Sequence, residues 1–117
     1  MKREKRFRKH VIEAANAYKN MLDNHYANGG NTADEISAKY GISRNTLQFA
    51  FKDAHGIGIR EYKLKQRMER SRQLLEEGKD VKEVAITLRY TEARAFSSAF
   101  KRYYGVTPTD FVNSVKA

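Results

Sequence analysis

The stretch of sequence that decides the fold spans residues 81–111, which read VKEVAITLRYTEARAFSSAFKRYYGVTPTDF. Asp80, directly before it, and Glu83 have the spacing of a capping box, which begins a helix by satisfying backbone N–H groups of the first turn. A second helix follows and ends before Gly105. A last helix begins with Pro108, because the first helical position tolerates the missing N–H of proline. The stretch therefore predicts three short helices in succession.

A similar pattern lies earlier in the chain. The motif TADE at residues 32–35 has the form of a capping box and predicts a helix over 33–40. Gly41 can take a positive φ without steric cost, and Ser43 is a good N-cap for a helix over 43–55. A helix, a tight glycine turn and a second helix together make a helix-turn-helix motif.

The two patterns are copies of one repeat. Asp80 lies 48 residues after Thr32, whereas Phe100 lies 49 residues after Phe51, so one residue is inserted at the second turn. Two matching halves are harder to obtain by chance than one. The repeat therefore predicts two helix-turn-helix motifs in one chain.

Two further helices complete an all-α fold of about seven helices. Apolar residues at steps of three and four predict a first helix that ends at Gly29-Gly30. Its packed face consists of Phe7, Val11, Ala15, Tyr18, Leu22 and Tyr26. A long helical pattern over 59–77, ended by Gly78, predicts a linker helix. Its packed face consists of Leu64, Met68, Ser71 and Leu75. The expected organisation is a basic N-terminal segment (1–9), a first helix-turn-helix subdomain (10–58), the linker helix (59–78) and a second helix-turn-helix subdomain (79–117).

The composition points to a polyanionic partner. The chain of 117 residues has 23 Lys and Arg against 14 Asp and Glu, a formal net charge of +9. Such a surface attracts phosphates and displaces their condensed counterions, so nucleic acid is favoured over acidic membranes or proteins. Cysteine is absent, which excludes disulfides and thiolate metal sites. We expect a cytoplasmic protein without membrane contact, because no secretory signal or spanning apolar run is recognisable.

Catalytic and metal-binding patterns are not found in the sequence. His10, His25 and His55 have no metal-ligand spacing, and no nucleophile is accompanied by a base. The adjacent pairs Asp34-Glu35 and Glu76-Glu77 would point in different directions on a helix, which suits capping and solubility. We therefore expect no enzymatic activity, no metal and no cofactor.

Together these residues resemble the DNA-binding domain of the AraC/XylS family of bacterial transcription regulators, at the size of its stand-alone members. Residues 81–111 are the most specific part, and ISAKYGISRNTLQFAFKDAHG at 36–56 and the linker positions Tyr62 and Arg67 support it. The resemblance covers about residues 11–112. It implies two helix-turn-helix subdomains joined by a rigid helix, promoter binding that usually activates transcription, and RNA polymerase as a further partner.

Two positions depart from the family pattern. Arg89 stands where the family has glycine in the second turn, so either that backbone is reshaped or the arginine carries a left-handed strain of roughly 1–2 kcal/mol. Gly58-Ile59 replaces the usual Ser-Pro at the start of the linker helix, which predicts a looser joint.

The second helix of each motif is expected to enter the major groove of DNA with its outward, N-terminal residues. In the first motif Leu47, Ala50 and Phe51 should be core, and in the second Phe96, Ala99 and Phe100, with Tyr103 and Phe111 also packed. The predicted base-reading residues are Arg44, Asn45, Gln48, Phe49, Arg94, Ser97 and Ser98. Arginine suits guanine, Asn and Gln suit adenine, and an exposed aromatic can touch the methyl group of thymine. The predicted phosphate-contacting residues are Lys52, Arg89, Lys101 and Arg102.

The first motif should discriminate more strongly. Gln48 is the strongest predicted base-reader, whereas only Arg94 on the second reading helix has real reading capacity. A linker of about 28 Å, against a DNA repeat of about 34 Å, would let one monomer bind an asymmetric site in two successive major grooves. Alternatives are a non-specific architectural DNA-binding protein and an adaptor that binds a partner protein. The chain either works alone or belongs to a longer regulator.

Overall fold

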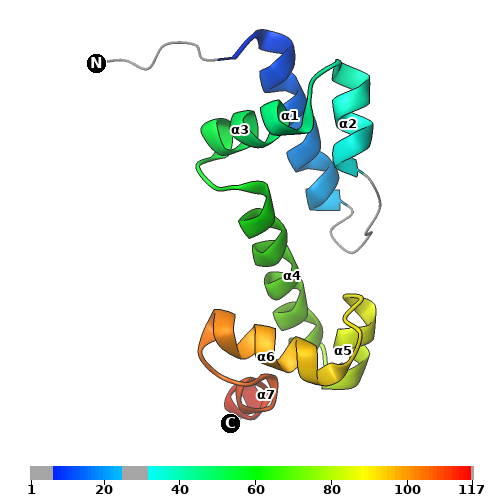
Figure 1. Ribbon diagram of the computed structural model, residues 1–117. Coiled ribbons are helices and arrows are strands. Elements are labelled where there is room, and N and C mark those ends of the chain that lie inside the picture. Colours follow the sequence, from blue (N-terminus) through cyan, green and yellow to red (C-terminus); the bar gives the residue numbers. More distant parts are fainter. Residues whose placement is uncertain (1–6, 25–31, 117) are drawn as a thin grey trace, which may run out of the picture. The chain divides into compact units, whose positions relative to one another are not determined.

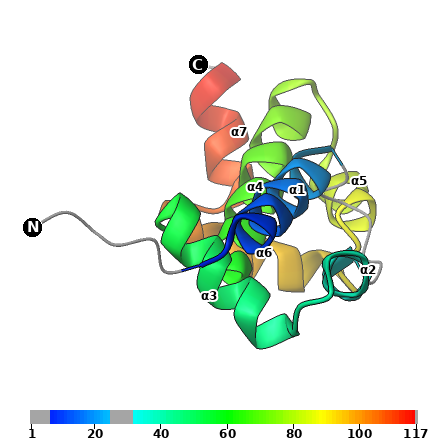
Figure 2. The ribbon, with the colours of Figure 1, turned by 90° about the horizontal axis from the view of Figure 1, so that it is seen from above.

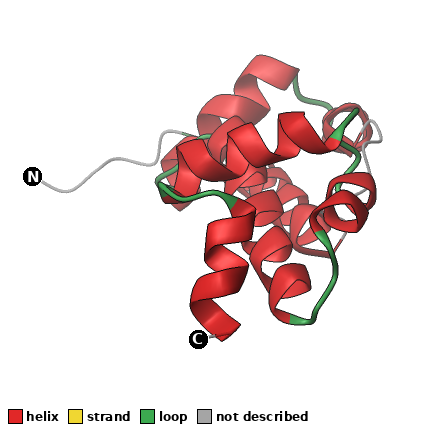
Figure 3. Ribbon diagram, turned by 90° about the horizontal axis from the view of Figure 1, so that it is seen from below, coloured by secondary structure: helices red, strands yellow, loops and turns green. Residues whose placement is uncertain are grey.

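The computed structural model describes residues 7–24 and 32–116, and every regular element within them is a helix (Figure 3). In chain order these helices are α1 (Lys9–Asn24), α2 (Thr32–Tyr40), α3 (Arg44–His55), α4 (Ile59–Glu76), α5 (Val81–Thr87), α6 (Ala93–Tyr104) and α7 (Pro108–Lys116). The prediction of an all-α fold with about seven helices is confirmed. The chain forms two compact units, residues 1–64 and 65–117, and the boundary falls within α4.

The first unit is organised around α1, which packs against both α2 and α3 (Figure 1 and Figure 2). The rings of Tyr18 and Phe51 of α3 pack in a T-shaped arrangement, with 5.9 Å between ring centroids. Phe51 also packs against Tyr62 at the start of α4, with centroids 5.7 Å apart. The buried apolar residues of this unit are Val11, Ala14, Ala15, Tyr18, Leu22, Ile36, Leu47, Ala50, Phe51 and Tyr62. Removing this apolar surface from water is what holds α3 in place.

The predicted packed face of α1 is confirmed where the structure describes it. Val11, Ala15, Tyr18 and Leu22 are buried, and Phe7 packs partly buried against the same core. Other predictions fall outside the described residues, namely Tyr26, the helix end at Gly29-Gly30, and the side chain of Thr32 in its capping box.

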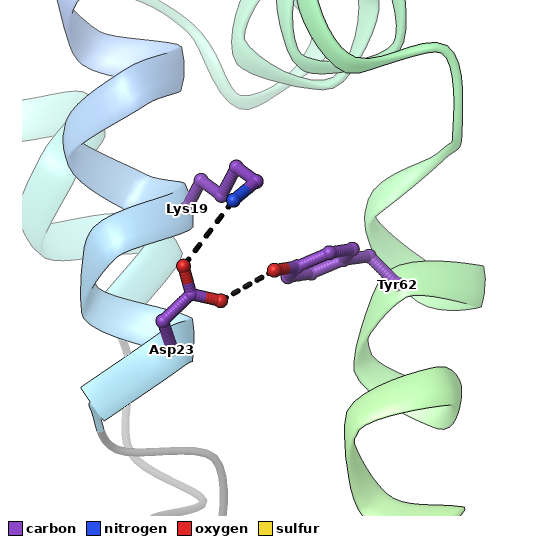
Figure 4. A network of polar contacts seen from close by, with 3 residues as sticks. All are labelled: Lys19, Asp23 and Tyr62. Atoms are coloured by element: carbon purple, nitrogen blue, oxygen red, sulfur yellow. Dashed lines mark hydrogen bonds and ion pairs between the residues drawn. The ribbon is translucent and has the colours of Figure 1, made fainter. Parts of the chain in front are cut away.

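A polar network links α1 to the start of α4 within the first unit (Figure 4). The hydroxyl of Tyr62 donates a hydrogen bond to Asp23, and Lys19 Nζ lies 3.3 Å from the second oxygen of the same carboxylate. Burial raises the pKa of Tyr62, and the hydrogen bond to Asp23 adds to this rise. The hydrogen bond to Asp23 likewise raises the pKa of Lys19. The network fixes the first turns of α4 against α1.

The second unit is built around α6, which packs against α5 and α7. Phe100 lies at its centre, with ring centroids 5.7 Å from Phe96, 5.8 Å from Phe111 and 4.7 Å from Tyr104. The buried residues of this unit are Met68, Ser71, Leu74, Leu75, Val84, Ala85, Leu88, Phe96, Phe100 and Pro108. Ser71 satisfies its buried hydroxyl by donating to the Met68 carbonyl at 2.6 Å. Phe96 and Phe100, which were predicted to face inward from α6, are therefore core.

The helix-start signals of the second unit are confirmed. The Asp80 carboxylate accepts from the Glu83 N–H at 2.8 Å, and the Glu83 carboxylate accepts from the Asp80 N–H at 2.9 Å. This is the complete capping box. Thr107 accepts from the Asp110 N–H at 3.0 Å, and Pro108 is the first residue of α7.

Two packing predictions are wrong, and a third is met only in part. Tyr103 is 41% exposed, because Tyr104, one residue further round the helix, packs against Phe100 instead. Leu64 is 40% exposed, because the buried residues of α4 in the first unit end with Tyr62 and those of the second unit begin at Met68. Ala99, predicted to be core, is only half-buried.

Candidate nucleic-acid interface

The turn of the first helix-turn-helix motif fixes how α3 leaves α2. Gly41 has a φ of 66°. The N–H of Ile42 donates to the Ser37 carbonyl at 3.0 Å, and the N–H of Gly41 donates to Ala38 at 3.3 Å. These two bonds are the Schellman pattern, which ends a helix through one left-handed residue. Ser43 then caps α3 by accepting from the Thr46 N–H at 3.0 Å, as its position predicted.

The two faces of α3 are sharply different. Leu47, Ala50 and Phe51 point into the core and are almost completely buried. The predicted DNA-contacting residues of this helix are all exposed: Arg44, Asn45, Gln48, Phe49 and Lys52. Phe49 is 67% exposed, which is unusual for a large aromatic side chain in a small helical unit. Arg44 makes an exposed ion pair with Asp34 at 3.5 Å, and such a pair is weak enough to be exchanged for a phosphate or a base.

The second turn uses the same hydrogen bonds with a different residue. The N–H of Tyr90 donates to the Ala85 carbonyl at 2.9 Å, and the N–H of Arg89 donates to Ile86 at 3.0 Å. Arg89 therefore occupies the place of Gly41, with a φ of 65°, and among the described residues no other non-glycine has a positive φ. The sequence left open whether the backbone of this turn is reshaped or the arginine is strained. The backbone keeps the glycine-type turn, and Arg89 carries the strain.

Arg67 of α4 contacts the two residues that flank Arg89 in this turn. Its guanidinium donates to the Leu88 carbonyl at 2.7 Å and lies 4.2 Å from the centroid of the Tyr90 ring. The ring of Tyr90 in turn packs against Phe96 of α6, with centroids 5.6 Å apart. Both contacts of Arg67 are favourable for a guanidinium, one as a charged hydrogen bond and one as a cation–π contact. Sequence reasoning placed Arg67 on the linker helix but gave it no role at this turn.

The outward face of α6 carries smaller side chains near its N-terminus than that of α3. Arg94, Ser98, Lys101 and Arg102 are exposed, and Ser97 is half-buried. Ala93, at the start of the helix, is also half-buried. Glu92 occupies the N-cap position but makes no side-chain capping bond. The N-terminal half of α6 therefore presents one long polar side chain, Arg94, among small ones, as its sequence predicted.

A groove of about 530 Å³ runs beside the exposed face of α3 within the first unit. Residues of α3 form one side of it, and the first turns of α4 form the other. Arg60 and Lys63 lie on the α4 side, and both are exposed. Sequence reasoning missed these two residues, although their spacing of three in the first turns of a helix places them on one face.

The rest of the described chain offers no second kind of site. No three His, Asp or Glu side chains in residues 7–24 and 32–116 gather as a group that could hold a metal ion. Within the same residues, no helix is both long enough and apolar enough to cross a membrane.

Each of the two compact units contains a helix-turn-helix motif whose second helix, α3 or α6, exposes polar side chains. This arrangement defines a paired helix-turn-helix DNA-binding domain. Residues 36–114 match the profile of the family described as "Helix-turn-helix domain". The chain is 34% identical over 84 residues to the Msm operon regulatory protein of Streptococcus mutans, covering 71% of this chain and 30% of that protein. It is 32% identical over 85 residues to the probable transcription factor PqrA of Proteus vulgaris, covering 72% of this chain and 70% of that protein.

Solved structures share the fold. The C-terminal domain of the response regulator yesN from Fusobacterium nucleatum is 28% identical, with a TM-score of 0.72 over 86% of this chain and 98% of that chain. An AraC-type transcriptional regulator from Chromobacterium violaceum is 25% identical, with a TM-score of 0.67 over 88% of this chain and 89% of that chain. This chain belongs to the AraC-type helix-turn-helix family of transcription regulators.

Proposed function

We propose that this chain regulates transcription by binding double-stranded DNA at specific sequences, with α3 and α6 as its reading helices. One observation carries the proposal: each motif buries an apolar face of its second helix and exposes long polar side chains on the opposite face. That is the arrangement by which a helix-turn-helix motif presents side chains to the major groove. The net charge of +9 supports attraction to the phosphates of the duplex.

The two reading helices have different tasks in this proposal. On α3, Gln48 and Asn45 pair with adenine, Arg44 pairs with guanine, and Phe49 contacts a thymine methyl group. On α6, Arg94 is the main reader, and Ser97 and Ser98 allow a close approach. The side chains proposed to contact phosphates are Lys52, Arg89, Lys101 and Arg102. Most of the sequence preference then comes from the first unit.

The proposed DNA site is bipartite and asymmetric, because subdomains 10–58 and 79–117 carry different reading helices. In this proposal one chain occupies the site as a monomer, with residues 59–78 as the linker. The basic segment 1–9 would add contacts to the phosphates of the DNA backbone. By likeness to the family, the chain activates transcription through contact with RNA polymerase in the bacterial cytoplasm. Because it spans only 30% of the length of the Streptococcus mutans relative, its partners and signals are proposals as well.

Selection of binding sites from random duplexes tests the proposal. We expect a motif of two unlike halves that spans about two turns of DNA. Gln48→Ala should relax the preference at one base pair for a cost of about 1–3 kcal/mol. A selection without any enriched sequence would refute specific recognition.

A second candidate is a non-specific architectural DNA-binding protein, favoured by the small side chains on the outward face of α6. Lys101→Ala separates the two functions, because removing a cation that binds phosphate weakens binding to all sequences alike. If Gln48→Ala and Lys101→Ala have equal effects on selected and scrambled duplexes, the architectural function is supported. If the chain is not retained on DNA at all, it acts instead as an adaptor for a partner protein.

A further inference from the structure

The groove beside α3 brings long cationic side chains from two helices to one place. Arg44 and Lys52 reach it from α3, and Arg60 and Lys63 reach it from α4. Gln48 and Phe49, both proposed to read bases, line the same groove on the α3 side. The cations of α4 thus lie on the opposite side of this groove from the α3 side chains that would face the base edges.

The charges that face this groove are almost all of one sign. The side chains of Lys52 and Arg60 are exposed, and neither makes an ion pair within the described part of the chain. Among the described residues, Lys63 has a distant ring contact, with its Nζ 5.9 Å from the Tyr18 centroid, and no ion pair. Among the described residues that line the groove, Glu61 is the one carboxylate, and its Oε1 lies 4.0 Å from the position that a Cβ at residue 58 would occupy. Its charge is therefore directed to the start of its own helix.

We propose that this groove receives the sugar-phosphate backbone of one DNA strand, with Arg60 and Lys63 holding phosphates that flank the base pairs read by α3. A helix in the major groove has a phosphate chain along each side, and cations set back from the reading face can reach it. The guanidinium of Arg60 can grip a phosphate with two parallel N–H groups, whereas Lys63 acts as a point charge. This inference rests on the proposed DNA-binding function.

Such phosphate binding has a measurable signature. Each phosphate that is neutralised releases condensed counterions, so the slope of log K against log salt becomes about 0.9 shallower for each phosphate that is no longer neutralised. Arg60→Ala/Lys63→Ala should therefore make the slope about 1.8 shallower and weaken binding at least tenfold at low salt. The ratio of affinities for selected and scrambled duplexes should stay within about twofold, because phosphates carry no sequence information.

Lys65→Ala is the matched control, because Lys65 is an exposed cation on the same helix, two residues beyond Lys63 and about 200° round the helix axis. The full chain and its variants are measured by fluorescence anisotropy on both duplexes over a salt series, with circular dichroism to establish equal helix content. An unchanged slope in the double variant, or an equal change in Lys65→Ala, overturns the inference. A change in the selected-to-scrambled ratio would also overturn it, since the two residues would then read bases.

The same measurements keep the inference apart from the proposed function. If the unmodified chain shows no preference between the duplexes, the proposed specific function fails whatever the two variants do. If it shows preference and the slope does not respond to the double variant, only the groove assignment fails. Saturable binding of inorganic phosphate to the groove without DNA, abolished in the double variant, would assign the site to free phosphate and overturn the backbone assignment.

Discussion

Replacing Arg89 by glycine is expected to stabilise the second unit. Arg89 has a φ of 65° and occupies the left-handed position of a Schellman turn that closes on the Ala85 and Ile86 carbonyls. For a residue with a Cβ, this conformation costs roughly 1–2 kcal/mol relative to right-handed backbone. Glycine removes that cost, and Gly41 shows in the first unit that the same hydrogen bonds form with glycine in place.

The gain is smaller than the strain, because glycine has more freedom in the unfolded chain. This entropy offsets about 0.5–1 kcal/mol, so the net stabilisation from Arg89→Gly should be about 0.5–1 kcal/mol. Since 1.4 kcal/mol corresponds to a factor of ten, amide hydrogens that exchange by opening of the second unit should exchange about two- to fivefold more slowly. Exchange of α3 amides in the first unit provides an internal reference.

Arg89→Ala is the control variant, because it removes the same charge but keeps the Cβ and its left-handed cost. We expect it to give no gain over the unmodified chain in hydrogen exchange or in urea unfolding. If Arg89→Gly is no more stable than Arg89→Ala, the turn does not store backbone strain and the reasoning is wrong.

Arg67→Met should destabilise the second unit by about 2 kcal/mol, because the Leu88 carbonyl loses a charged donor and the Tyr90 ring loses a cation. Faster exchange of α6 amides with unchanged α3 amides would show this, and equal acceleration of both would contradict it. Raising the pH above about 10 should destabilise the first unit. Burial raises the pKa of Tyr62, so the folded chain holds the phenol proton more tightly than the unfolded chain does, and this stabilisation is lost as the pH rises through the raised pKa. Tyr62→Phe should weaken this alkaline loss in thermal unfolding followed by circular dichroism, and an undiminished loss in the variant would assign it to other groups.

Much of the fold follows from local patterns in the sequence. The capping box at Asp80, the N-cap at Ser43 and the proline start of α7 are short-range features, and each forms within four residues of chain. The family resemblance also identified Arg89 as the residue in the glycine position of the second turn, and Gly41 holds that position in the first. Predictions of this kind succeed because the partners are neighbours in sequence.

Features that depend on distant partners could not be predicted in the same way. Helical periodicity gives the face on which a residue lies, but not which turns of that face are covered by another helix. Leu64 and Tyr103 were therefore assigned to the core incorrectly. The bond from Arg67 to the Leu88 carbonyl joins residues 21 apart and has no local signature. Likewise, Arg60 lies beside the exposed face of α3 only because the chain turns between the two helices.

In the proposed complex, the exposed ring of Phe49 has a consequence for the binding of chemically modified DNA. An apolar contact recognises the methyl group at C5 of thymine but does not sense the groups at C4 that distinguish thymine from cytosine. In the proposed complex, 5-methylcytosine presents the same methyl group to Phe49. Where that contact is the only discrimination at its base pair, cytosine methylation would convert a rejected sequence into an accepted one, so the set of sites bound in a cell would depend on its methyltransferases.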